Sequence, residues 1–248
     1  MRDLIVRGVR AGTMRSDAQL RASLAETLRE ASEDVWIFAY GSLMWNPPFA
    51  VAERRIVRVS GYHRSFCLRS TLGRSSVESP GLMLALDAGG ATVGVALRMA
   101  RDGFEGELAL LWRRGMSTGS YVAKWLRAQD ELGEIQVLAF VANRRAANYV
   151  GGLPDDETVR LLATGVGFLG TNLDYLVRTH SRLTDHGIND PKVKRLMRLC
   201  SRRDSLACGV TSYAQRHVGP LHVNRRMVAR AVVSCLSCDC DHPPTTSR

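Results

Sequence analysis

A glycine-serine turn directly after an apolar strand is the part of this sequence best suited to chemistry on an anion. Residues 35–40 (VWIFAY) are β-branched, aromatic or apolar, which predicts a buried strand, and Gly41-Ser42 follows as a turn. Successive backbone N–H groups in such a turn can point at a carboxylate, or at a carbonyl oxygen that gains negative charge. Ser42 adds a hydroxyl donor, and Tyr40 adds an aromatic wall with a polar tip. The alternative interpretation is a buried strand followed by an ordinary turn.

The elements that must position this turn are predicted from hydrophobic periodicity. Strands are expected over residues 56–62, 63–68 and 134–143. A hairpin is expected from residues 81–87 and 93–99, with its turn at Gly89-Gly90. Helices are expected over residues 105–114, 155–163, 172–184 and 192–199. Because most strands precede most helices, the order is typical of an α+β fold.

Three regions are predicted along the chain. Residues 1–33 form an N-terminal leader with one helix, on which Leu20, Leu24 and Leu28 share a face and which Ser16 or Asp17 caps. Residues 34–200 form the main domain. Residues 201–248 lose periodicity and gain cysteine and arginine, so we expect a C-terminal extension without stable structure.

Composition excludes several classes of protein. The chain has 248 residues, 45% of them hydrophobic and 23% charged, which is ordinary for a globular domain. No apolar run approaches the length of a membrane span, and no secretory signal is recognisable, so we expect a cytoplasmic protein with no membrane partner. The net charge of +10 favours anionic partners. Its arginines are spread along the chain, so nucleic acid is the less favoured partner and a small anionic metabolite is the favoured one.

No metal site or cofactor is predicted. Cys235, Cys238, Cys240 and His242 lie too close together for the two separated halves of a usual zinc site, and an unstructured cysteine-rich tail is the favoured interpretation. Cys67 follows an apolar strand and is expected in the core. Residues 165–170 (GVGFLG) match a dinucleotide-binding fingerprint, but a helix rather than a strand is predicted before them, so the match is rejected.

Several blocks in order make the chain similar to the ChaC-type γ-glutamylcyclotransferases. Residues 38–45 match that family's strand-turn signature FGYGSL followed by an aliphatic residue and tryptophan, with Ala39 where glycine is usual. The resemblance continues through residues 61–67 (GYHRSFC), 70–71, 80–81, 94–96, 119–121 and 170–176 (GTNLDYL). It covers roughly residues 34–200.

The resemblance implies a small mixed β-barrel flanked by helices and a reaction on glutathione that yields 5-oxoproline and cysteinylglycine. It assigns the binding of the γ-glutamyl group to Tyr40, Gly41, Ser42 and Leu43. Asn172 and Tyr175 match a later block near the cavity, although a helix cap and a core tyrosine are equally good interpretations of these two residues. The substrate's own α-amine attacks its γ-carbonyl, so positioning supplies much of the rate and no metal or nucleotide is required.

The residue that should move the proton is missing. The family carries a glutamate in an aromatic-Arg-Arg-Glu-Met motif, and this chain has Gly115 at that position in Trp112-Arg113-Arg114-Gly115-Met116. The candidates for a replacement carboxylate are Glu105 and Glu107 upstream, and Glu78 and Asp87 if the fold brings them close. Glu107 lies about 12 Å away along a helix, too far to stand in directly. A second departure is Leu72-Gly73-Arg74, where relatives often carry His-Arg-Gly and where the peptide end of glutathione is expected to bind.

Three hypotheses of function therefore remain open. The chain is an enzyme of the γ-glutamylcyclotransferase class, impaired by the loss of the glutamate. It is a binding protein that kept the γ-glutamyl pocket without turnover. It is, least favoured, a basic nucleic-acid-associated protein, for which steeply salt-dependent binding is expected.

Overall fold

The computed structural model describes residues 14–31 and 34–203. Apart from Arg202 and Arg203, these residues belong to one compact unit, Met1–Ser201. The predicted C-terminal extension, with its cysteine cluster, lies outside the described residues except for residues 201–203. No helix within the described ranges is long and apolar enough to cross a membrane.

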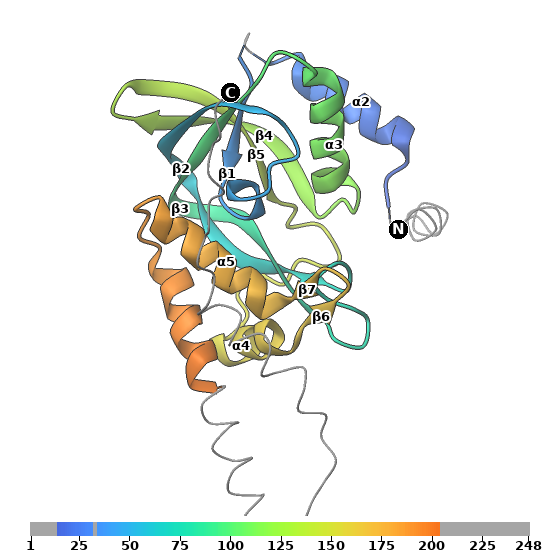
Figure 1. The fold of residues 1–248 in the computed structure, drawn as a ribbon. Helices are drawn as coiled ribbons and strands as arrows, with labels where there is room; N and C mark the ends of the chain where they lie inside the picture. Colours follow the sequence, from blue (N-terminus) through green and yellow to red (C-terminus); the bar gives the residue numbers. More distant parts are fainter. Residues whose placement is uncertain (1–13, 32–33, 204–248) are drawn as a thin grey trace, which may run out of the picture. The chain divides into compact units, whose positions relative to one another are not determined.

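A closed, mixed β-barrel forms the centre of the unit (Figure 1). Its strands are β1 (Trp36–Ala39), β2 (Val51–Ser70), β3 (Gly81–Met99), β4 (Tyr121–Asp130) and β5 (Gly133–Ala142). They follow the order β1-β3-β2-β4-β5, with antiparallel neighbours. Parallel pairing of Ile37 with Leu138 and of Leu86 with Val141 closes the barrel. The α+β class and the mixed barrel are thus confirmed.

The predicted hairpin over residues 81–99 is wrong. β3 is one long strand that pairs antiparallel with β2 along nearly its whole length, so its two halves never pair with each other. Gly89 and Gly90 have φ of 102° and 73°, and they lie opposite the register shift at Gly61, whose φ is 83°. These glycines bend a two-stranded ribbon at a bulge instead of reversing the chain. The two strands expected at residues 56–68 are likewise one strand, β2, with a bulge at Gly61.

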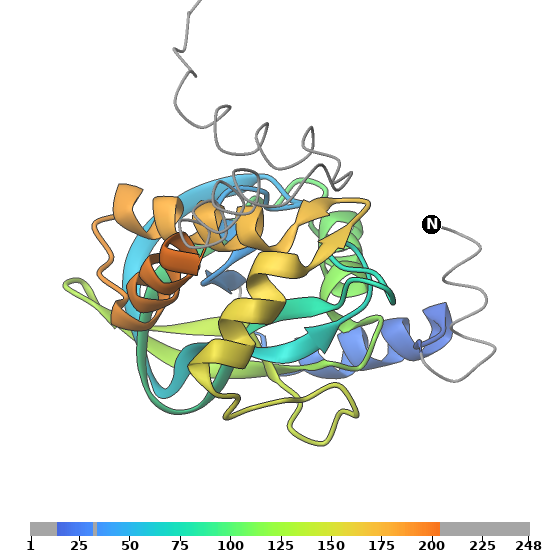
Figure 2. The same cartoon turned by 90° about the horizontal axis from the view of Figure 1, so that it is seen from below.

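Helices lie on two sides of the barrel (Figures 1 and 2). α2 (Asp17–Leu28) and α3 (Phe104–Met116) lie side by side, joined where the Trp112 indole donates to Ser23 Oγ over 2.9 Å. α4 (Asp155–Thr164), α5 (Asn172–Asp185) and a last helix over residues 191–203 lie together elsewhere on the barrel. All these helices were predicted, with ends within a few residues. A short hairpin of β6 (Val166–Gly167) and β7 (Gly170–Thr171) precedes α5.

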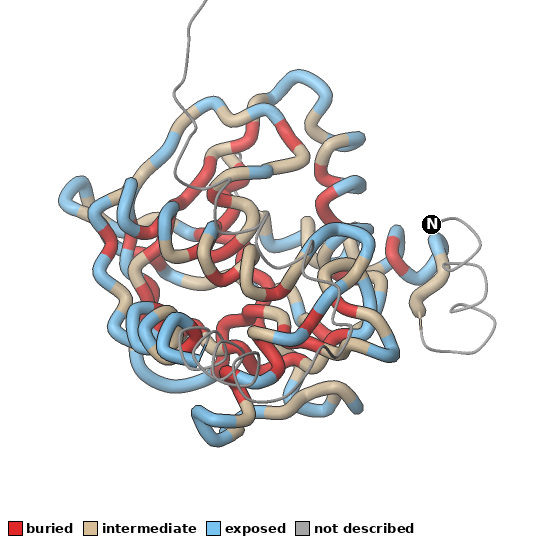
Figure 3. Tube along the Cα trace, turned by 60° about the horizontal axis from the view of Figure 1, so that its bottom comes forward, coloured by how far each residue is buried: buried red, intermediate tan, exposed pale blue. Residues whose placement is uncertain are grey.

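The leader helix packs onto the barrel domain as its apolar face predicts. Ser16 caps it through a capping box with Gln19. Leu20 is buried, and Leu24 and Leu28 pack against the core. The core fills the barrel and the seams beneath the helices, where buried positions recur along the strands (Figure 3). Cys67 is buried, as expected.

Candidate functional site

The turn after β1 is built as the sequence predicts. β1 is buried along its whole length, and the chain leaves it at Gly41 into a short 3-10 helix, η1 (Ser42–Met44). The Asn46 N–H donates to the Ser42 carbonyl over 2.9 Å, which fixes the turn. Because a helix leaves its first N–H groups without partners inside the helix, the start of η1 offers donors to a ligand.

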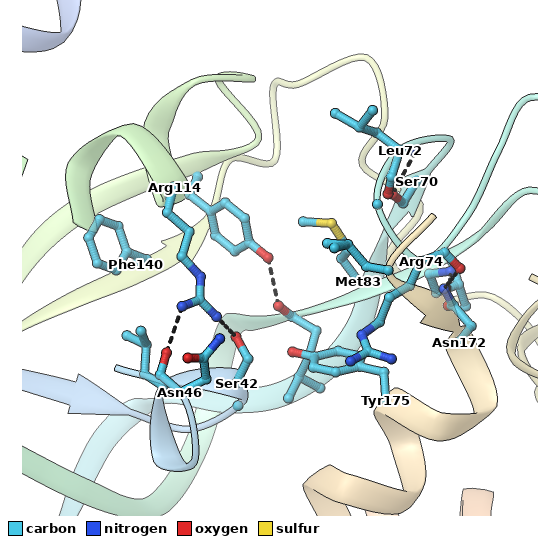
Figure 4. A pocket seen from close by; sticks show the side chains of 18 of the residues that line it. Ser42, Asn46, Ser70, Leu72, Arg74, Met83, Arg114, Phe140, Asn172 and Tyr175 are labelled. Atoms are coloured by element: carbon cyan, nitrogen blue, oxygen red, sulfur yellow. Dashed lines mark hydrogen bonds between the residues drawn. The ribbon is translucent and has the colours of Figure 1, made fainter. Parts of the chain in front are cut away.

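A cavity of about 370 Å³ lies beside this turn, a size typical of small-molecule sites. It is lined by every residue to which the sequence assigned the site: Tyr40, Gly41, Ser42, Leu43, Gly115 and Tyr175. These residues come from the turn after β1, from η1, and from α3 and α5, so the fold gathers segments that are more than 100 positions apart in the chain. Figure 4 shows Ser42, Arg114 and Tyr175 around the cavity. The binding roles of these residues remain predictions.

Tyr175 stands against the turn from α5. Its hydroxyl would be only 2.9 Å from a Cβ at position 41, so the absence of a side chain at Gly41 makes room for it. The Tyr175 ring packs edge-on against Phe66, with centroids 6.1 Å apart. Burial raises the pKa of Tyr175, although hydrogen bonding from Ser42 acts in the opposite direction. The hydroxyl therefore stays protonated at neutral pH and is placed to donate to a ligand oxygen.

Tyr40 serves as a wall of the cavity, because its hydroxyl already donates to the Phe140 carbonyl over 2.6 Å. Burial raises the pKa of Tyr40 well above its usual value. Its own carbonyl accepts from the Nε of Arg64 over 2.8 Å. Arg64 is 3% exposed and also pairs with Asp190 over 3.0 Å. A buried ion pair between β2 and the segment before the last helix thus fixes the residue that precedes the turn.

Arg114 is a site residue that the sequence reading missed. It extends from α3 into the cavity, where its Nη2 donates to Ser42 Oγ over 2.8 Å and its Nη1 donates to the Asn46 carbonyl over 2.6 Å (Figure 4). No carboxylate of the described residues pairs with it. Its position next to Gly115 was the one available signal, and it does not single out Arg114, because Arg113 and Met116 are as close in sequence and do not line the cavity.

Gly115 faces the cavity beside the ring of Phe140. A Cβ at this position would lie 3.2 Å from two Phe140 ring carbons, so a side chain here requires a small shift of that ring. Because Gly115 lines the cavity, a side chain at this position would border the space open to a ligand. The role of position 115 in proton transfer remains a prediction.

Arg74 forms the other cationic part of the lining, on a different side of the cavity from Arg114 (Figure 4). Its Nη1 donates to Asp174 over 2.7 Å, and its guanidinium lies over the Tyr175 ring, 5.8 Å from the centroid. Asn172 holds this segment: its Nδ2 donates to the Arg74 carbonyl and its Oδ1 accepts from Leu82 N–H over 2.7 Å. Asn172 is thus a buried clamp, and the helix cap is Thr171.

No carboxylate lines the cavity among the residues that the structure describes. Glu107 accepts from the Ala50 N–H over 3.0 Å, outside the lining. Asp87 is held by Arg144 and Tyr149 at 2.7 and 2.9 Å. Glu78 and Glu105 do not reach the lining either. None of the four acidic residues considered from the sequence takes the place of the missing glutamate.

Comparison with known proteins gives consistent matches over the same part of the chain. A family model described as "ChaC-like protein" matches residues 35–203. The glutathione-specific γ-glutamylcyclotransferase of Escherichia coli (strain K12) is 40% identical over 185 residues, which cover 73% of this chain and 80% of that protein. Glutathione-specific γ-glutamylcyclotransferase 1 of Homo sapiens is 35% identical over 149 residues, covering 58% and 67%.

A solved structure with the same fold also matches. The crystal structure of a selenomethionine-labelled γ-glutamylcyclotransferase specific to glutathione from yeast aligns with a TM-score of 0.63 and covers 69% of this chain and 97% of that one. At 17% sequence identity, this likeness concerns the fold.

Proposed function

The chain belongs to the ChaC-like protein family, and on that premise we propose that it acts on glutathione as a γ-glutamylcyclotransferase, releasing 5-oxoproline and cysteinylglycine. The observation that carries the proposal is the single cavity in which the turn after β1, Arg114 and Tyr175 converge. The relatives at 40% and 35% identity are named for this activity and support it. We further propose a cytoplasmic protein that needs neither metal nor cofactor.

The proposed mechanism relies on positioning. The γ-glutamyl amine attacks the γ-carbonyl of the same molecule, so holding the folded conformer supplies a large part of the acceleration. The N–H groups at the start of η1 and the Tyr175 hydroxyl are the donors available to the oxygen that gains negative charge. Arg114, anchored on Ser42 and Asn46, is the cation available to the substrate's α-carboxylate.

Proton transfer is the step for which the cavity lacks a group. Gly115 stands where the family carries its glutamate, and no described carboxylate lines the cavity. Loss of a general acid-base group typically costs about 10²–10⁴ in rate. We therefore propose an enzyme with reduced turnover. The same observation favours a second candidate function, a binding protein for γ-glutamyl compounds without turnover.

Release of 5-oxoproline from glutathione tests this proposal in the native chain and in Gly115→Glu. We expect the variant to be faster by about 10²–10⁴, because a carboxylate at this position can take the amine proton and return it to the leaving nitrogen. Gly115→Gln is the matched control, since its amide has the same size and presses equally on Phe140 but cannot exchange a proton.

Each outcome distinguishes between the two candidates. Slow native turnover with acceleration by Gly115→Glu alone supports the impaired enzyme. An inert native chain that binds glutathione supports the binding protein. Native turnover as fast as that of Gly115→Glu means that another group transfers the proton, and the role given to position 115 is then wrong.

A further inference from the structure

Two arginines give the lining of the cavity a positive charge. Arg74 and Arg114 are the only ionised side chains at neutral pH in its lining, as far as the structure describes the chain. Asp174 lies behind Arg74 at 2.7 Å but also pairs with Arg178 at 3.1 Å, so this cluster of three charges keeps a net charge of +1. Arg114 bonds only to neutral oxygens, those of Ser42 and Asn46.

This charge acts in opposite directions on the two charged groups of a γ-glutamyl compound. A carboxylate is attracted by either guanidinium. An α-ammonium meets two cations there, and no described carboxylate of the lining is available to pair with it. A nearby like charge disfavours the protonated form of an amine and lowers its pKa. A carboxylate at position 115 would supply the counter-charge, but this chain has glycine there.

We infer that the cavity takes γ-glutamyl compounds with their α-amine uncharged, and that binding near neutral pH releases one proton to solvent. The inference rests on the proposed function, since it concerns the ligand of the same cavity. Arg74 and Arg114 thereby select the substrate with an uncharged, nucleophilic amine. Removal of the amine proton is one of the two steps for which the family uses its glutamate. The α-amine of a γ-glutamyl compound lies beside a free α-carboxylate, so its pKa in solution is above the value of about 8 for a peptide α-amine. The two arginines must therefore lower this pKa for the uncharged form to bind near neutral pH.

The subsequent reaction needs no external base. The uncharged amine nitrogen bonds to the γ-carbonyl carbon, and the bond from that carbon to the cysteine nitrogen breaks. One proton moves from the attacking nitrogen to the leaving nitrogen, which departs as an amine. Atoms and charges therefore balance between glutathione and its two products.

The side chains that line the cavity do not change their protonation over the relevant pH range. Burial is the largest cause that raises the pKa values of Tyr40, Tyr121 and Tyr175, which come from the turn after β1, from β4 and from α5, so all three stay protonated between about pH 6.5 and 9. A guanidinium does not lose its proton in this range. No histidine or lysine of the described residues lines the cavity. A pH dependence of binding in this range consequently reports on the ligand.

Calorimetric titration of the full chain with S-methylglutathione tests the inference, because this ligand lacks the thiol proton of glutathione. Titrations near neutral pH in buffers of different ionisation enthalpy count the protons released, and we expect about one. The affinity should rise about tenfold per pH unit until the pKa of the free amine is reached. The analogue with glutaryl in place of γ-glutamyl, which has no amine, should bind without proton release and with constant affinity.

Variants at position 115 link the effect to the missing carboxylate. Gly115→Glu should bind S-methylglutathione without releasing a proton, because the carboxylate pairs with the ammonium. Gly115→Gln adds a side chain of the same size without a charge, so it should still release about one proton per ligand bound, whatever its effect on affinity. Binding of S-methylglutathione by the native chain with no proton release and a constant affinity overturns the inference and leaves the proposed function standing. Failure of both ligands to bind overturns the two together.

Discussion

At the scale of single residues, the absence of a side chain at Gly41 allows the Tyr175 hydroxyl of α5 to lie close to the turn after β1. A Cβ there would lie 2.9 Å from the Tyr175 hydroxyl and 3.3 Å from a Leu84 methyl group. We expect Gly41→Ala to displace the hydroxyl and to weaken glutathione binding about tenfold, the value of one well-placed hydrogen bond. Some stability should be lost as well, about 1–3 kcal/mol, because the added Cβ overpacks a site that already holds the Tyr175 hydroxyl and the buried Leu84.

Calorimetry and denaturant unfolding of the same variant separate these two effects. Gly106→Ala is the matched control, because a Cβ at this position of α3 meets nothing within 4 Å. It should leave binding unchanged and raise stability by up to about 1 kcal/mol, the difference in helix propensity between glycine and alanine. A Gly41→Ala variant that binds glutathione as well as the native chain would contradict the role given to this contact.

A local pattern in the sequence identifies the strand-turn of the site, and the family resemblance adds Gly115 and Tyr175, but both miss Arg114. Tyr40 to Leu43 form one strand-turn, so a local pattern identifies them. Arg114 acts through Ser42, which lies 72 positions earlier in the chain, and no periodicity encodes that distance. The contacts of Asn172 are also long-range, since its amide bonds to the Arg74 carbonyl and to the Leu82 N–H of β3. These contacts, and the capping of α5 by Thr171, rule out the helix-cap interpretation of Asn172.

At the scale of elements, the same limit explains the errors in the barrel. Gly89-Gly90 between two apolar runs is a hairpin signal when only neighbours in sequence are considered. In the fold, β2 supplies partners along both runs, so the glycines bend a ribbon that continues. β4 received no prediction, because its alternation is broken by half-buried Trp125 and Leu126. The helices were found because their periodicity is local.

The ion pair of Arg64 with Asp190 joins β2 to the segment before the last helix, and the structure predicts a large cost for breaking it. Arg64 is 3% exposed and donates to Asp190 and to the carbonyls of Tyr40 and Val93. Arg64→Ala removes this donor from all three acceptors. We expect unfolding free energy to fall by about 3–5 kcal/mol in urea titrations, the range for removing one partner of a buried pair.

Arg69→Ala is the matched control on the same strand. Arg69 pairs with Glu157 at 3.5 Å, and both side chains are about two-fifths exposed, at 42% and 37%. Such a surface pair contributes about 0–1 kcal/mol. Equal losses of unfolding free energy in the two variants would contradict the stabilising role given to the Arg64–Asp190 pair.

At the scale of the whole molecule, the net charge of +10 comes from arginines spread along the chain, many of which form separate ion pairs. Several exposed arginines have an acidic neighbour, as in the pairs Arg113–Asp17, Arg182–Asp185 and Arg195–Asp155. This distribution disperses the positive potential of the described part of the chain. The unpaired Arg114 instead concentrates charge inside a cavity, which suits a small anion better than a phosphate backbone.

Salt dependence separates these two kinds of anionic partner. We expect the dissociation constant for glutathione to change only a few-fold between about 50 and 200 mM salt, because few charges are involved and they meet inside a cavity. A protein that contacts six to ten phosphates would lose about 10³–10⁵ in affinity for duplex DNA over that range. Calorimetry with glutathione and fluorescence anisotropy with a labelled duplex measure both quantities on one preparation. Tight duplex binding that is lost steeply with salt would favour the nucleic-acid hypothesis. Salt-tolerant binding of glutathione together with weak duplex binding would instead identify the cavity as the site that binds the anionic partner.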